Sequence, residues 1–328
     1  MSVATGIGSL PGEDFHQAIR LVLDELPDLP HLPELPARGA IANMTGRTLA
    51  VVADLGFDLQ PAGWRLTDAA GIDHRRARSL LSQDLDGFEE LTQSYRGELK
   101  LQVAGPWTLA STVEKPRGDK VLSDHGARRD LAQALAEGLR THVADVRRRV
   151  PDATLIVQVD EPALPFVLNG QVPTASGFGR HRRIHPPEAS AALEGVFEAI
   201  TAAGAVPVAH CCGADAPIEL VRGAGARGIS LDADLLTTSA YDEVGALLEA
   251  GERLFLGVVP SSQETAMPGE RAVTERVLRL LDMLGFDPEA VGAQLVLTPS
   301  CGLAGASPEH AKKALALVRT SASQLAQG

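Results

Sequence analysis

The sequence has little of three features that mark particular classes of protein. Aromatic residues make up only 4% of the 328 residues, there are three cysteines, and 30 Lys and Arg residues stand against 42 Asp and Glu, a net charge of -12. The odd, low cysteine count gives no disulfide framework and favours a reducing compartment. The net negative charge argues against a nucleic-acid partner, and the basic run at 147–149 lies in a helical pattern without interleaved aromatics.

The chain also lacks a long apolar run. No stretch approaches the length of a membrane span, and the first residues show no signal-peptide pattern, so we expect no membrane partner and a cytoplasmic location. The sequence is instead 45% hydrophobic, which can supply a large aliphatic core. No low-complexity linker divides it, and we predict a single domain over residues 1–328.

Short apolar runs alternate with longer amphipathic segments, a pattern typical of βα units around a parallel sheet. Apolar residues at helical spacing cover 128–149, 187–203, 241–250 and 269–284, and Ser307-Pro308 opens a last helix. The pattern predicts an α/β fold, a (β/α)8 TIM barrel, with a doubly wound open sheet as the alternative. The eight candidate strands lie at 5–9, 58–61, 100–104, 154–159, 206–209, 228–231, 253–257 and 294–298.

His210, Cys212 and Cys301 are the strongest candidates for a functional site. Side chains alternate along a strand, so His210 and Cys212 share a face while Cys211 points away from it. Each of the two segments runs from an apolar strand to a glycine, where barrel enzymes collect their functional groups. Three N and S ligands with one open position are typical of a reactive zinc centre that activates a thiol. The alternative is that the cysteines are small buried fillers.

Other polar motifs also follow predicted strands. Ser9, in Ile-Gly-Ser-Leu-Pro, offers a hydroxyl and an amide to a ligand or else belongs to a simple turn. Only one of the adjacent carboxylates Asp160 and Glu161 can face the mouth of a barrel, and we assign Asp160 to hold a cationic amine. Trp107 can wall a ligand pocket or serve in packing.

Asp232 and Asp234 follow the sixth predicted strand. Either carboxylate can complete a zinc shell or orient a histidine ligand, and either can instead cap the next helix.

Four motifs in order resemble the C-terminal catalytic barrel of cobalamin-independent methionine synthase. They are Ile-Gly-Ser-Leu-Pro at 7–11, Val-Asp-Glu-Pro-Ala-Leu at 159–164, His-Cys-Cys at 210–212 and Pro-Ser-Cys-Gly-Leu at 299–303. The resemblance covers nearly the whole chain. It implies a (β/α)8 barrel related to uroporphyrinogen decarboxylase, and a decarboxylase would not need the His and Cys ligands.

The resemblance also implies roles for individual residues. It assigns His210, Cys212 and Cys301 as zinc ligands and homocysteine as the small-molecule substrate, whose thiolate attacks a methyl donor. Asp232 falls where the family has an acidic ligand, with Asp in place of the usual Glu, and Asp234 stays an alternative. For the amine and carboxylate of homocysteine the resemblance implies Ser9, Glu34 and Asp160.

Two departures from the family pattern bear on the methyl donor. The chain is expected to start directly at the catalytic barrel, without the N-terminal barrel that helps to hold a folate tail. The stretch 256–260, Leu-Gly-Val-Val-Pro, lacks the histidine that protonates the departing folate in the family. We therefore expect methylcobalamin or a corrinoid protein as donor, and no catalytic residue beyond the zinc site.

Two alternative functions remain at this point. One is a methylcobamide:thiol methyltransferase that acts on another small thiol, and the other is a non-catalytic zinc-binding or corrinoid-binding partner protein.

Overall fold

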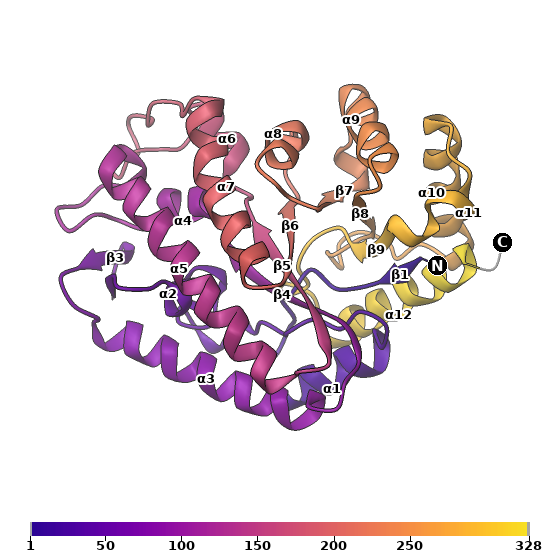
Figure 1. The fold of residues 1–328 in the computed structure, drawn as a ribbon, viewed down its shortest axis with the longest axis horizontal. Helices are drawn as coiled ribbons and strands as arrows, with labels where there is room; N and C mark the ends of the chain where they lie inside the picture. The colour runs from indigo at the N-terminus through magenta and orange to yellow at the C-terminus, as the bar shows by residue number, and fades with distance from the viewer. Residues whose placement is uncertain (1, 327–328) are drawn as a thin grey trace.

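A curled parallel sheet forms the centre of the protein. The structure, a computed structural model, describes residues 2–326. In Figure 1 the strands β4 to β9 lie in the middle of the molecule, with α3, α5 and α7 on one side and α9, α10 and α12 on the other. The sheet has seven strands in the order β1-β9-β8-β7-β6-β5-β4. These strands are β1 (Val3–Ala4), β4 (Gly97–Ala104), β5 (Ala153–Asp160), β6 (Val206–Cys211), β7 (Gly228–Asp232), β8 (Arg253–Val259) and β9 (Leu295–Pro299).

Helices follow most of the strands and cover the outer face of the sheet. Five of the described α-helices begin at a residue whose side chain accepts a hydrogen bond from a first-turn amide. These residues are Asp14 before α1, Asn43 before α2, Asp124 before α5, Asp287 before α11 and Ser307 before α12. The α-helices are α1 (Phe15–Glu25), α2 (Met44–Val51), α3 (Ile72–Thr92), α4 (Pro106–Thr112), α5 (His125–Arg149), α6 (Leu164–Leu168), α7 (Pro186–Ala202), α8 (Ile218–Gly223), α9 (Thr238–Glu249), α10 (Glu270–Leu284), α11 (Pro288–Val291) and α12 (Pro308–Leu325). The 3-10 helices are η1 (Pro36–Arg38), η2 (Val121–Ser123), η3 (Ala233–Leu235) and η4 (Gly292–Gln294). Within the described residues, no helix combines the length and the apolar character that crossing a bilayer requires.

The strand order advances one strand at a time and brings the first strand beside the last. All neighbouring pairs in this sheet are parallel. A doubly wound sheet reverses its order at a switch point, so this alternative is wrong. The last six predicted strands are confirmed as β4 to β9, and the four predicted helices are confirmed as α5, α7, α9 and α10.

The first two strand predictions need correction. The first strand is β1, which ends before the predicted segment 5–9 begins. The predicted strand 58–61 belongs to a separate antiparallel hairpin of β2 (Gly56–Gln60) and β3 (Gly63–Thr67). A two-residue turn at 61–62 lets β2 pair with the nearest stretch of chain, so it takes no part in the parallel sheet.

Residues 30–35 link the two edges of the curled sheet instead. On one side the Leu32 amide donates to the Lys100 carbonyl (2.9 Å) and the Lys100 amide donates to the Pro30 carbonyl (2.9 Å). On the other side the Glu34 amide donates to Gly8 (3.1 Å) and the Leu10 amide donates to Glu34 (2.8 Å). Three prolines interrupt the segment 30–36. Because proline has no backbone N–H to donate, the sequence pattern of this segment does not predict a strand.

The inner face of the sheet changes from apolar to polar along the strands. A small buried cluster fills one end of the curl and contains Leu29, Ile156, Val208, Phe255 and Val296. Because side chains on one face recur every second residue, Gln158 and Asp160 follow Ile156, and His210 follows Val208. The polar residues therefore gather at the carboxyl ends of the strands, where the candidate site lies.

Candidate active site

Three candidate metal ligands meet at the carboxyl ends of β6 and β9. One ligand atom from each of His210, Cys212 and Cys301 lies within 4.8 Å of the others. His210 belongs to β6, Cys212 follows that strand, and Cys301 comes two residues after β9. The two sulfur atoms are 3.0 Å apart. The cluster thus joins two segments that are 89 residues apart in the sequence.

A hydrogen bond inside the sheet orients the histidine. His210 Nδ1 lies 2.9 Å from Ser230 Oγ on the neighbouring strand β7, and both side chains are buried. With Nδ1 engaged in this way, Nε2 is the nitrogen left for a metal. Cys211 points to the opposite face, and burial raises the pKa of its thiol to about 11.

The pKa values of the two facing thiols are shifted in opposite directions. The hydrogen bond from Cys212 lowers the pKa of Cys301 to about 4, with further help from His210 and the Gly302 amide. The same contact raises the pKa of Cys212 above its usual range. The shared hydrogen bond thus favours the thiolate form of Cys301 over that of Cys212, and a thiolate favours a cation beside it.

The three candidate ligands, here called the metal-ligand trio or the metal end, line a cavity of about 420 Å³. Ser9, Glu34 and Asp160 line the same cavity, together with Asn43, Met44 and Thr45 at the start of α2. Among the described residues that line it, the two carboxylates are not accompanied by a lysine or an arginine. The cavity thus offers sulfur and nitrogen ligands together with the carboxylate oxygen atoms of Glu34 and Asp160, which we call its carboxylate end.

The loop after β1 fits closely against the loop after β9. A Cβ atom on Gly302 would overlap Ser9 Oγ, and the Leu303 amide donates to the Ser9 carbonyl (2.9 Å). Gly8 has a φ of +154°, and a Cβ there would lie 2.7 Å from Gln102 Cγ. These two glycines allow Ser9 to lie directly beside the metal-ligand trio.

Asp160 and Glu161 point in different directions. Asp160 lines the cavity, whereas the Glu161 carboxylate accepts from the Trp107 amide (2.9 Å), the Thr108 amide (2.8 Å) and the Thr108 hydroxyl (2.7 Å). Glu161 thereby caps the N-terminus of α4, and Asp160 is the carboxylate that faces the cavity.

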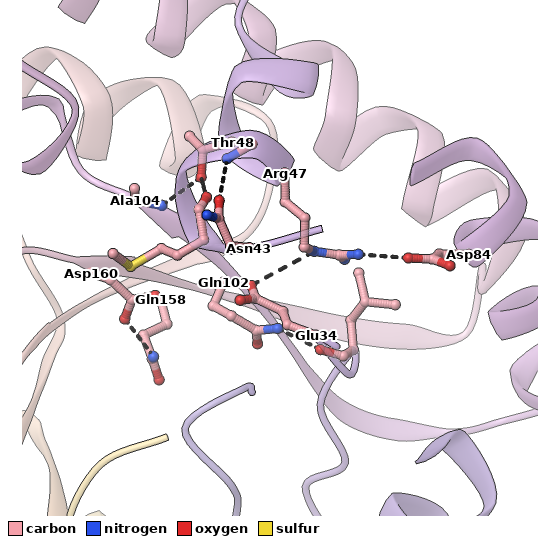
Figure 2. A network of polar contacts seen from close by, with 12 residues as sticks. Glu34, Asn43, Arg47, Thr48, Asp84, Gln102, Ala104, Gln158 and Asp160 are labelled. Atoms are coloured by element: carbon pink, nitrogen blue, oxygen red, sulfur yellow. Dashed lines mark hydrogen bonds and ion pairs between the residues drawn. The ribbon is translucent and has the colours of Figure 1, made fainter. Parts of the chain in front are cut away.

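Burial raises the pKa of both cavity carboxyls. The pKa of Glu34 rises to about 7, although the nearby Arg47 guanidinium opposes the rise, and the pKa of Asp160 rises to about 6. Figure 2 shows Arg47 between Glu34 and Asp84. Arg47 Nε lies 3.8 Å from Glu34 Oε1, and Arg47 Nη1 donates to Asp84 Oδ2 at 2.7 Å.

The structure does not bring the predicted fourth ligand into the trio. Asp232 Oδ1 accepts from the Asp234 amide (2.9 Å) and so caps η3, which was the alternative role for this residue. Asp234 Oδ1 pairs with Arg276 Nη2 at 2.6 Å. The fourth ligand stays a prediction.

The structure also places Trp107 away from the cavity. Its indole is 2% exposed, and Nε1 donates to the Ala189 carbonyl at the start of α7 (3.0 Å). The residue packs under α7 and lines a different cavity, of about 550 Å³, between α5 and α7. Its place in a substrate pocket stays a prediction.

Several polar residues of the inner face were missed in the sequence. Lys100, Gln102 and Gln158 are buried and connect to groups that line the cavity. The available signal was a charged or amide side chain in an apolar strand, as in Leu-Lys-Leu-Gln-Val-Ala at 99–104. A polar residue at such a position requires a buried partner.

Comparison with known proteins identifies the class of the protein. The family described as "Cobalamin-independent synthase, Catalytic domain" matches residues 93–324, and the chain belongs to this family. It is a methyltransferase of the cobalamin-independent methionine synthase type. The comparison with curated proteins gives no match.

Solved structures support the fold. A B12-independent methionine synthase from Shewanella sp. W3-18-1, in complex with selenomethionine, is similar with a TM-score of 0.60 at 13% identity, over 99% of this chain and 97% of that one. The tandem GH20 catalytic modules of the pneumococcal exo-β-D-N-acetylglucosaminidase StrH are similar with a TM-score of 0.50 at 8% identity, over 98% and 85%. At these identities the likeness concerns the fold alone.

The family leaves one expectation without support. Because it is cobalamin-independent, it does not support methylcobalamin or a corrinoid protein as the methyl donor.

Proposed function

We propose that this protein transfers a methyl group to the thiol sulfur of homocysteine and forms methionine, with zinc as its resident metal. One observation carries the proposal. The His210, Cys212 and Cys301 trio shares a cavity with the carboxylates of Glu34 and Asp160. A thiol that carries an ammonium group matches both ends of such a cavity.

The three ligand residues fit zinc. Zinc binds imidazole nitrogen and thiolate sulfur at about 2.0–2.3 Å, so atoms within 4.8 Å of one another can share one ion. The oxygen-rich shells that magnesium and calcium prefer are not formed by this trio. When bound here, zinc would supply the Lewis acidity that keeps the acceptor thiol deprotonated at neutral pH.

The residues of the chain bind and orient the acceptor. Asp160 and Glu34 bind its ammonium group, and Ser9 donates its hydroxyl to the carboxylate of the amino acid. Ser230 holds the ring of His210 in place. The new C–S bond forms as the bond between the methyl group and its donor breaks, and the electron pair leaves with the donor.

For the methyl donor, family membership favours a methylated tetrahydrofolate. The stretch 256–260 has no histidine to protonate such a leaving group, and this favours methylcobalamin as the second candidate. The two donors give opposite expectations in a single assay.

The decisive experiment is methionine formation from homocysteine by the zinc-loaded protein, with methyltetrahydrofolate and methylcobalamin as donors in parallel. Turnover with the folate alone supports the family's donor, and turnover with methylcobalamin alone supports the corrinoid. No methionine with either donor, from protein that contains zinc, would contradict homocysteine methylation.

The metal shell is proposed to include Asp232 as fourth ligand once zinc is bound, with homocysteine taking its place or adding to it. An Asp232→Asn variant should then bind zinc more weakly in a chelator competition. An unchanged zinc affinity would rule out this ligand.

Residues 30–35 are proposed to act as the second strand of a closed (β/α)8 barrel. The hydrogen bonds of Leu32 and Glu34 to both edges of the sheet support this arrangement. Slow hydrogen exchange at these two amides is expected, and exchange as fast as in an exposed loop would contradict closure.

A further inference from the structure

A buried lysine connects the segments that carry the carboxylate end of the cavity. Lys100, on the inner face of β4, is fully buried. Its Nζ donates to the Ile7 carbonyl (2.8 Å), to Gln158 Oε1 (2.8 Å) and to Gln102 Oε1 (3.4 Å). An ammonium group has three protons, and these three acceptors match them in number.

The contacts of Lys100 orient two amide side chains. An amide presents an oxygen on one side and a nitrogen on the other, so an oxygen held by Lys100 turns the nitrogen the opposite way. Gln158 Nε2 therefore donates to Asp160 Oδ1 (2.7 Å), as Figure 2 shows, and to the Ile7 carbonyl (3.0 Å). Gln102 Nε2 donates to the Leu32 carbonyl.

Each of these contacts ends at a segment that lines the cavity. Gln158 holds Asp160 directly, the Ile7 carbonyl precedes Gly8 and Ser9, and Leu32 lies two residues before Glu34. The three candidate groups that would bind the ammonium and carboxylate of the substrate, Ser9, Glu34 and Asp160, thus lie on segments that are linked by hydrogen bonds to Lys100. The metal-ligand trio forms no hydrogen bond with Lys100 among the described contacts.

We propose that Lys100 is a positioning residue that sets the affinity and selectivity of this cavity for an amino-acid thiol. It acts through Gln158 and Gln102 and touches neither the substrate nor the metal. Without the lysine, the Gln158 oxygen loses its donor, and only the bonds of its nitrogen to Ile7 and Asp160 hold the amide. The amide can then turn its oxygen toward Asp160 and displace the carboxylate from the ammonium. The inference rests on the proposed function, because it takes an amino-acid thiol as the acceptor.

The test compares two thiols on the zinc-loaded protein by calorimetry. Homocysteine carries the ammonium and carboxylate groups, whereas 1-propanethiol has a thiol and neither charged group. In the Lys100→Met variant we expect the Kd of homocysteine to rise about tenfold or more, with the Kd of propanethiol and the zinc content nearly unchanged. A role in folding alone would move both thiols together.

Two further variants make the test robust. Gln158→Met keeps Lys100 but removes the link to Asp160, so it should weaken homocysteine selectively, and it stands in if Lys100→Met does not fold. Thr298→Val is the matched control. Thr298 is a fully buried polar residue that follows Val296 on the inner face of β9, and its hydroxyl forms no hydrogen bond with this network. Its preference for homocysteine should equal that of the wild type.

The outcomes separate the inference from the proposed function. If the wild type prefers homocysteine and Lys100→Met or Gln158→Met keeps that preference, the positioning role is wrong while the proposed acceptor stands. If the wild type binds homocysteine no better than propanethiol, both the acceptor and the positioning role are overturned.

Discussion

The two ends of the cavity are built in different ways. At the metal end, His210 and Cys212 come from consecutive positions of one strand face, and Cys301 follows another strand. At the carboxylate end, Glu34 and Asp160 depend on Arg47, Gln158 and Lys100 behind them, as Figure 2 shows in part. The positions of the metal ligands follow from where β6 and β9 end. The positions of the two carboxylates depend on buried polar side chains that contact them.

This difference has a physical reason. Thiols and a neutral imidazole can be buried at modest cost, so strand ends alone can present them. A buried carboxylate needs compensating donors, which distant segments supply here. Changes at the metal end should therefore abolish activity, whereas changes at the carboxylate end should shift selectivity.

The largest effect is expected at the metal end. A Cys301→Ser variant replaces a thiolate ligand by a hydroxyl, so zinc should be lost and the rate should fall to below about 1% of the wild type. Metal analysis and methionine formation measure the two losses. Cys211→Ala is the matched control, because this thiol faces the other side of β6 and its loss should leave zinc bound. Full activity in Cys301→Ser would contradict the zinc mechanism.

The second effect concerns the carboxylate end. Asp160→Asn keeps the shape of the side chain but removes the charge that binds the ammonium group. Loss of a charge-assisted hydrogen bond costs about 1.5–3 kcal/mol, so the KM for homocysteine should rise roughly 10–150-fold. Zinc content should not change. An unaltered KM would make an amino-acid thiol doubtful as the acceptor.

A third prediction uses pH to separate the two ends. Burial raises the pKa of Glu34 to about 7, while Arg47 and Lys100 lower it and Asp160 raises it. Glu34 gains a proton as the pH falls through this value and then no longer attracts an ammonium group. The Kd of homocysteine, divided by that of propanethiol at the same pH, should therefore rise by up to about tenfold from pH 8 to pH 6.

Propanethiol carries the pH dependence of the thiol and the metal, so the ratio isolates the carboxylate end. In Glu34→Gln the part of this slope that comes from Glu34 should disappear. A slope as steep as in the wild type would assign the titration to another group.

A smaller effect is expected at Gly302, which follows Cys301 and lies against Ser9. In Gly302→Ala the new methyl group overlaps Ser9 Oγ, so the Ser9 side chain must move. We expect homocysteine binding to weaken by about 1 kcal/mol, roughly fivefold, with zinc still bound. Calorimetry with both thiols checks this result, and equal weakening for both would show that the whole cavity has shifted.

The smallest effect lies outside both ends. Ser307 Oγ accepts from the His310 amide (3.2 Å) and caps α12, so Ser307→Ala should lower the free energy of unfolding by about 1 kcal/mol without changing the KM. Urea unfolding measures the loss. Ser323→Ala is the control, because its exposed hydroxyl only donates to the Arg319 carbonyl within the same helix. Equal losses in both variants would contradict the capping role.

The sequence alone determined the regular part of the fold and the metal end. Six apolar runs predicted β4 to β9, and the period of two along a strand put His210 and Cys212 on one face. Such signals are local, because strand propensity and side-chain alternation need no distant partner. The same local reasoning wrongly predicted a strand of the parallel sheet at 58–61, because a nearby turn lets this segment pair with β3 in a hairpin.

Only the tertiary structure decided the rest. It placed the proline-rich residues 30–35 between the edges of the sheet and gave Asp232 Oδ1 the role of a cap. It also placed Trp107 under α7, outside the cavity that the metal-ligand trio lines. It also joined Lys100 to Ile7 and Gln158, which are 93 and 58 residues away in the sequence. Buried polar groups take whichever partner the folded chain brings within hydrogen-bond distance, and residue spacing in the sequence does not encode that partner.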